Sequence, residues 1–127
     1  KGSARAIKRG GFAVLVASSS DANKRAQKSW SDAVAWAAKA ERATPIVGPV
    51  VVNVEFLLPR PKSVSRAAHT VKPDLDKILR CTLDALTGIA FTDDSQVVRV
   101  VASKHYASAT TGPGANIHIT NYSEELP

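Results

Sequence analysis

Two stretches in the first half of the chain have apolar patterns that are typical of β-strands. Val50–Leu58 has an apolar residue at every second position, so it predicts a strand that is covered on at least one face. A shorter apolar patch, Phe12–Ala17, follows the Gly10-Gly11 pair and predicts another strand after a turn.

Two more strands are predicted in the last third of the chain. Residues 96–106 alternate in the same way, and Ala115, Ile117 and Ile119 mark a short final strand. Residues 112–114, Gly-Pro-Gly, form a turn sequence between them. We therefore expect the last two strands to pair as a hairpin.

Two helices are predicted between the strands. Residues 24–43 repeat apolar side chains at helical spacing until Pro45 ends the pattern. Residues 74–88 do the same, and Gly88 is placed to cap the C-terminus. The apolar faces consist of Trp30, Ala33, Val34, Ala37 and Ala40 in the first helix and of Leu75, Ile78, Leu79, Thr82, Leu83 and Leu86 in the second.

The order of the elements is strand, helix, strand, helix, strand, strand. This order favours an α+β fold in two layers, a mixed β-sheet with two helices packed on it. The 127 residues suffice for one compact domain, and no internal repeat or low-complexity linker divides them. Residues 59–73 have no periodicity, and a loop of this length in a small domain is usually functional or mobile.

Composition narrows the class of protein. Hydrophobic residues make up 44% and charged residues 22% of the chain, which excludes wholesale disorder and fibrous repeats. The single Cys81 cannot form an internal disulfide, and it is expected to pack within its helix. No signal peptide or apolar stretch of membrane-spanning length is visible. These features suit a reducing, cytoplasmic compartment.

Charge is unevenly distributed along the chain. The formal net charge is +6, and residues 1–30 hold seven basic residues and one acidic residue, so the remainder is neutral. Residues 1–25 form a basic arm, and an acid-free stretch from Arg60 to Lys72 precedes five acidic residues between positions 74 and 94. Basic flanks around an acidic centre would suit a polyanion if a cation lay among the acids. Chance clustering on a soluble surface would give the same pattern.

The acidic residues suggest a metal site. Asp74 and Asp76 flank Leu75 where the second helix should begin. Asp74 could simply cap the helix, but this role leaves Asp76 unexplained. If the chain is still extended through Leu75, both carboxylates project to one side and can reach one cation. Asp93 and Asp94 add further oxygen ligands, and bound Mg²⁺ would remove the repulsion between clustered carboxylates.

Basic and acidic side chains also alternate on the second helix. Asp76, Arg80 and Asp84 are four residues apart and share one face. Such a ladder is commonly a row of surface salt bridges. Near a metal-bound phosphate, Arg80 would instead be a fixed cation facing the charge that develops on transfer. No ligand spacing relates the three histidines, which are expected to be ordinary loop or strand residues: His69, His105 and His118.

Three segments resemble, in order and spacing, the RusA family of Holliday junction resolvases. They are Lys72-Pro73-Asp74-Leu75-Asp76, Leu83-Asp84-Ala85-Leu86-Thr87-Gly88 and Asp93-Asp94-Ser95-Gln96-Val97-Val98. The basic segment of residues 1–30 is similar to the family's opening, which normally follows a first strand that we expect to be missing here. The resemblance covers nearly the whole chain as one domain, residues 1–127. It implies a homodimeric endonuclease that depends on Mg²⁺, or Mn²⁺ in its place, and cuts paired strands of four-way DNA junctions.

The resemblance also implies roles for single acidic residues. The family's Asp-x-Asp pair falls on Asp74 and Asp76, and its later acid falls on Asp94. These three would hold one or two Mg²⁺ ions, with Asp93 a secondary candidate as a ligand or as a residue that shapes the loop. The metal would generate hydroxide from bound water and stabilise the leaving oxygen.

The chain departs from the family pattern at two positions. The family commonly has Asn directly after Asp-Leu-Asp, where this chain has Lys77, and a catalytic Lys four residues after the second Asp, where it has Arg80. Arg keeps the charge but releases no proton near neutral pH, so an electrostatic role remains. Lys77 lies one turn before Arg80 and could serve the same phosphate.

The predicted function is therefore resolution of four-way junctions by an endonuclease with affinity for branch shape more than for sequence. An alternative of another class is a junction-binding or architectural protein that does not cut DNA, and a generic soluble α+β domain would make the charge clusters coincidental. The bases expected to hold the DNA backbone are Lys1, Arg5, Lys8, Arg9, Lys24, Arg25, Lys28, Arg60, Lys62, Arg66 and Lys72.

Overall fold

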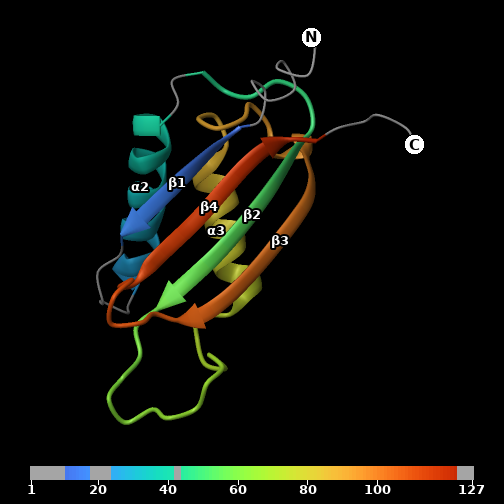
Figure 1. Ribbon diagram of the computed structural model, residues 1–127. Coiled ribbons are helices and arrows are strands. Elements are labelled where there is room, and N and C mark those ends of the chain that lie inside the picture. The colour runs from blue at the N-terminus through green and yellow to red at the C-terminus, as the bar shows by residue number, and fades with distance from the viewer. Residues whose placement is uncertain (1–10, 18–23, 42–43, 123–127) are drawn as a thin grey trace, which may run out of the picture.

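The computed structural model describes residues 11–17, 24–41 and 44–122. Within them the chain forms one four-stranded sheet, two α-helices and one 3₁₀ turn (Figure 1). The predicted α+β fold with a mixed sheet is confirmed. In chain order the elements are β1 (Phe12–Ala17), α2 (Lys24–Glu41), β2 (Val50–Leu58), α3 (Leu75–Leu86), η1 (Asp94–Gln96), β3 (Val97–Tyr106) and β4 (Gly114–Asn121).

The strand order in the sheet is β1-β4-β2-β3. β4 is antiparallel to both β1 and β2, whereas β3 is parallel to β2 and lies at the edge. The predicted hairpin between the last two strands is therefore wrong. The alternating residues Ala115, Ile117 and Ile119 are at most 3% exposed, and a central strand buries them better than an edge strand would. The chain leaves β3, crosses the end of β2 through a hydrogen bond from Ala107 N to Leu58 O, and returns as β4.

Both helices cover the same face of the sheet (Figure 1). Alternate residues of the strands point to this face and form the core with the apolar sides of α2 and α3. Trp30 of α2 joins the two layers, since its indole Nε1 donates to Thr82 Oγ1 of α3 at 2.9 Å and its ring lies 6.2 Å from that of Phe56. No helix in the described ranges is long and apolar enough to cross a membrane.

The parallel pairing of β2 with β3 decides where the two ends of α3 lie. β2 and β3 begin at the same end of the sheet, with Val50 beside Val97 and Leu58 beside Tyr106. α3 must therefore return along the sheet in the opposite direction, as Figure 1 shows. The N-terminus of α3 and residues 59–73 lie where β2 and β3 end, and η1 lies where they begin.

Candidate functional site

Asp74 and Asp76 stand at the beginning of α3. Asp74 has extended backbone angles, φ −67° and ψ 141°, while Leu75 is already the first helical residue. The chain is thus not extended through Leu75, so the condition under which both carboxylates would project to one side is not met. The side chain of Asp74 makes no capping hydrogen bond; its Oδ2 instead lies 3.9 Å from Lys77 Nζ. Asp74 therefore is available as an anionic group at the helix start.

Asp93 and Asp94 belong to a separate turn at η1. Asp93 caps this turn, since its Oδ1 accepts from the backbone N–H of Ser95 at 2.9 Å. The pKa of Asp93 is held below its ordinary value, chiefly by the hydrogen bond from the Ser95 amide. Hydrogen bonding with the Asp94 and Ser95 side chains contributes less. Asp93 is therefore a residue that shapes the loop, which is one of its two predicted roles. Asp94 is the first residue of η1 and is exposed.

Gln96 organises the turn that carries these acids. Its Oε1 accepts from the backbone N–H groups of Thr92 and Asp93 at 2.8 and 2.9 Å. Its Nε2 donates to the carbonyls of Ile46 and Gly48 at 2.9 and 2.7 Å. Gln96 belongs to the third motif, but its role could not be predicted from the sequence, because its partners lie up to 50 residues away.

Within one chain the two acidic groups lie at opposite ends of α3 (Figure 1). Asp74 follows Pro73, whose carbonyl is bound by Lys104 near the end of β3. Asp94 comes three residues before Val97, the first residue of the same strand. The twelve residues of α3 separate the groups by roughly 18 Å.

The described part of one chain therefore does not contain the predicted three-acid site. No group of three His, Cys, Asp or Glu side chains among those residues is close enough to share a metal ion. A single chain thus does not fit Mg²⁺ through Asp74, Asp76 and Asp94 together. Their assignment as metal ligands stays a prediction, and so does that of Asp93.

The two candidate catalytic cations lie on the exposed side of α3. The salt-bridge ladder through Asp76, Arg80 and Asp84 is absent from the described residues, where the one ion pair of α3 joins Lys77 to Asp74. Arg80 is exposed. Both cations are exposed, and Lys77 is the one of the two whose ammonium lies near a candidate metal ligand, 3.9 Å from Asp74.

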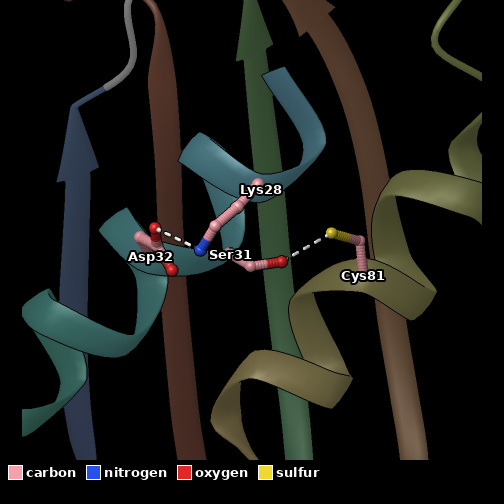
Figure 2. A network of polar contacts seen from close by, with 4 residues as sticks. All are labelled: Lys28, Ser31, Asp32 and Cys81. Atoms are coloured by element: carbon pink, nitrogen blue, oxygen red, sulfur yellow. Dashed lines mark hydrogen bonds and ion pairs between the residues drawn. The ribbon is translucent and has the colours of Figure 1, made fainter. Parts of the chain in front are cut away.

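The structure describes only some of the predicted DNA-binding residues. Lys28 lies on α2 and pairs with Asp32 at 3.4 Å, as Figure 2 shows. Lys62, Arg66 and Lys72 are exposed on residues 59–73, and this loop extends past the end of the sheet in Figure 1. The remaining bases of the arm, Lys1, Arg5, Lys8 and Arg9, and the side chains of Lys24 and Arg25 lie outside the described part of the chain.

Arg60 has an internal role in the same loop. Its Nη1 donates to the carbonyls of Val64 and Arg66 at 3.3 and 2.8 Å. Its guanidinium lies 4.3 Å from the centre of the Tyr106 ring, the range of a cation–π contact. Arg60 is itself exposed, but these contacts commit its side chain to the loop, so Lys62, Arg66 and Lys72 are better placed for DNA.

His69 is a second neighbour of the Tyr106 ring. Its ring centre is 4.7 Å from that of Tyr106, and His69 is only 7% exposed. Burial, followed by the charges of Lys104 and Arg66, lowers the pKa of His69. Neither His69 Nδ1 nor the Tyr106 hydroxyl has a hydrogen-bond partner within the described residues. His69 is thus a loop residue, as expected, but one buried in an electropositive environment.

Cys81 connects the two helices. Its Sγ lies 3.0 Å from the hydroxyl of Ser31 on α2 (Figure 2). Cys81 is partly buried on α3, so its expected packing within the fold is confirmed. It lies on the side of α3 that faces α2.

Fold and site together define a small α+β domain in which a basic loop runs directly into acidic residues at the start of a helix. Residues 8–120 match the family described as endodeoxyribonuclease RusA. The chain belongs to this family, and the resemblance of the three motifs is confirmed. It is also similar to the uncharacterized protein YqaN of Bacillus subtilis (strain 168), with 38% identity over 76 residues that cover 50% of this chain and 54% of YqaN. The match thus spans about half the length of this curated relative.

Proposed function

We propose that this protein is an endonuclease that resolves four-way DNA junctions with the help of a divalent cation. The observation that carries the proposal is the family match over residues 8–120, which includes the basic loop and both acidic groups. The loop supplies the exposed bases Lys62, Arg66 and Lys72, which would bind backbone phosphates independently of sequence. Asp74 follows directly, so phosphate binding and the acidic residues are adjacent in the chain.

The reaction requires more than a polyanion-binding surface. Mg²⁺ would supply a metal-bound nucleophile and charge stabilisation when bound. The protein would contribute carboxylates at the start of α3, the Lys77 ammonium 3.9 Å from Asp74, and Arg80 as a cation that holds the scissile phosphate. Asp74 and Asp76 alone leave such a site short of protein ligands, and the third acid, Asp94, lies at the far end of the helix.

A symmetric dimer resolves this difficulty. A two-fold axis across β3 would reverse the direction of the second copy and bring Asp94 of the partner subunit toward Asp74 and Asp76. β3 is the edge strand of the described sheet, so one side of its backbone is open to pairing with a second copy. Val98 and Val101, which are 54% and 49% exposed, add apolar surface beside that edge. A four-way junction also has two equivalent strands to cut, which suits two identical sites.

The test of the activity compares a labelled four-way junction with a linear duplex, each in Mg²⁺ and in EDTA. Wild-type protein should cut paired strands of the junction only in Mg²⁺. Asp74→Asn, Asp76→Asn and Asp94→Asn should each abolish cutting while junction binding in EDTA persists, since the bases supply the affinity. The exposed Glu41→Gln at the end of α2 is the matched control and should cut normally. Full activity in any of the three aspartate variants would remove that residue from the site.

The dimer makes a separate prediction. Sedimentation at micromolar concentration should give twice the monomer mass. When Asp74→Asn protein is mixed and re-equilibrated with Asp94→Asn protein, half of the dimers are mixed, and each mixed dimer contains one site with all its acids. Nicking of one strand should therefore return in the mixture although neither variant cuts alone. A mixture that stays inactive despite subunit exchange would mean that each site is built from one chain.

One observation favours a second candidate function. The acids of a single chain do not converge, as expected for a junction-binding protein that keeps the basic loop and does not cut. Such a protein would bind the four-way junction equally in Mg²⁺ and in EDTA and release it intact. The cleavage assay distinguishes the two functions directly.

A further inference from the structure

The side chain of Lys104 is bound to the segment that leads into α3. Its Nζ lies 2.8 Å from the carbonyl of Val71 and 2.8 Å from the carbonyl of Pro73. These carbonyls stand on either side of Lys72, and Pro73 directly precedes Asp74. The ammonium of Lys104 therefore fixes the backbone on both sides of Lys72, a candidate phosphate-binding residue. The second of these carbonyls belongs to the residue directly before Asp74, a candidate metal ligand.

The position of Lys104 on the sheet makes it a rigid support. It lies opposite Phe56 near the end of β3, on the same face of the strand as the buried Tyr106 two residues later. Two of its three donors bind carbonyls, and hydrogen bonds from a charged donor are about twice as strong as neutral ones. No carboxylate in the described residues pairs with Lys104. Its charge is thus directed at the backbone of residues 71–73.

The rest of the loop is held at the same end of β3. Tyr106 has Arg60 over its ring and His69 beside it, at 4.3 and 4.7 Å. Arg60 in turn binds two carbonyls inside the loop. Residues 60, 69, 71 and 73 are therefore all connected to two neighbouring side chains of one strand, so the loop has a defined shape before any ligand arrives.

We infer that Lys104 is a positioning residue for the proposed cleavage reaction: it holds Val71 and Pro73 so that Lys72 and the carboxylates of Asp74 and Asp76 are presented in a fixed arrangement. The inference rests on the proposed function. Lys104 acts through the backbone, and it differs in this from the exposed loop bases, which would touch DNA. A displacement of about 1 Å at a reacting group can reduce a rate by about a hundredfold, so loss of this support should lower turnover more than affinity.

The kinetic test uses Lys104→Met, which keeps the length of the side chain and removes its charge and donors. On a four-way junction in Mg²⁺, kcat should fall by about ten- to a hundredfold, while KM and junction affinity in EDTA stay within about twofold. Lys104→Arg should recover most of kcat, because a guanidinium can also donate to two carbonyls. Lys62→Met should show the opposite split, with weaker binding and a smaller salt dependence. Lys39→Met, an exposed site on α2, should match wild type.

A measurement on the free protein separates this inference from the proposed function. Amide hydrogen exchange should accelerate at residues 71–77 in Lys104→Met and stay unchanged in α2, and Lys104→Arg should restore protection. Unchanged exchange at residues 71–77 would overturn the inference whether or not the protein cuts DNA. A loss of junction affinity with unchanged kcat would overturn it too, since Lys104 would then be a DNA contact. Lys104→Arg provides a second test that does not depend on the folding of Lys104→Met, because slower turnover or faster exchange at residues 71–77 in that variant would also overturn the inference.

Discussion

Gln96 allows the sharpest test of how this site is built. Its side chain uses both of its acceptor and both of its donor capacities, with two backbone N–H groups on one side and the carbonyls of Ile46 and Gly48 on the other. A typical hydrogen bond contributes a net 0.5–1.5 kcal/mol, so four bonds amount to about 2–6 kcal/mol. The groups are partly exposed, and water replaces some of the bonds. We therefore expect Gln96→Ala to lower the free energy of unfolding by about 2–3 kcal/mol.

Gln96→Glu distinguishes hydrogen bonding from simple packing, because it keeps the size and shape of the side chain. The carboxylate can still accept from the two N–H groups, but its second oxygen faces two carbonyl oxygens and cannot donate. We expect a loss of about 1–3 kcal/mol at pH 7 from the two missing donor bonds. Protonation of the new carboxyl restores one donor, so the difference from wild type should shrink as the pH falls toward 4.

Urea unfolding followed by circular dichroism measures both variants, with Lys39→Ala on the exposed side of α2 as a surface control expected within about 0.5 kcal/mol of wild type. For a chain of this size, 2 kcal/mol also corresponds to a fall in Tm of roughly 6–12 °C. If both Gln96 variants unfold at the wild-type urea concentration, the four bonds contribute no net stability. If Gln96→Glu equals wild type while Gln96→Ala does not, packing is what matters.

Two other predictions concern the candidate cations and His69. Arg80→Lys should keep most of the cleavage activity and Arg80→Ala should lose about ten- to a thousandfold; normal cleavage by Arg80→Ala with a large loss in Lys77→Ala would identify Lys77 as the working cation. The lowered pKa of His69 means that the unfolded chain binds more protons between that value and 6.5, so its contribution to stability rises with pH across this window. His69→Phe keeps a ring against Tyr106 and cannot titrate, so its unfolding free energy should change less between pH 7.5 and 5 than that of wild type; an identical pH dependence in urea titrations would refute the assignment.

The local elements of this fold could be predicted because each has a strong pattern of its own. The strand Val50–Leu58 and the two helices were found within a few residues of their observed ends. The pairing of strands was not, since β3 and β4 are adjacent in sequence and share a Gly-Pro-Gly turn but lie on either side of β2. The position of a strand in the sheet depends on how completely its apolar face must be buried. That burial is set by the whole sheet and cannot be read from one segment.

The candidate site was predictable as a set of residues and not as an arrangement. The motif that contains Asp74 and the one that contains Asp94 are identified by their order in the chain. This order does not tell how far apart a helix places the two motifs in space. Lys104 could not have been found in this way, because it acts on backbone carbonyls more than thirty residues away and any residue type can supply a carbonyl. In such a contact only the residue that donates from its side chain has a recognisable type, and its carbonyl partner has none.

Both acidic groups of the site depend on the same strand. Gln96, one residue before β3, holds the turn of Asp93 and Asp94, and Lys104 near its end holds the backbone before Asp74. The eight residues from one to the other span roughly 26 Å of strand, and β2 keeps this length fixed by parallel pairing. Because β3 is also the edge strand of the sheet in the described ranges, pairing along it would set the distance between protomers as well. In the proposed dimer, the register of the pairing along β3 would therefore decide whether the acids of the two subunits meet. The residues on the exposed side of this strand would then determine which dimer forms.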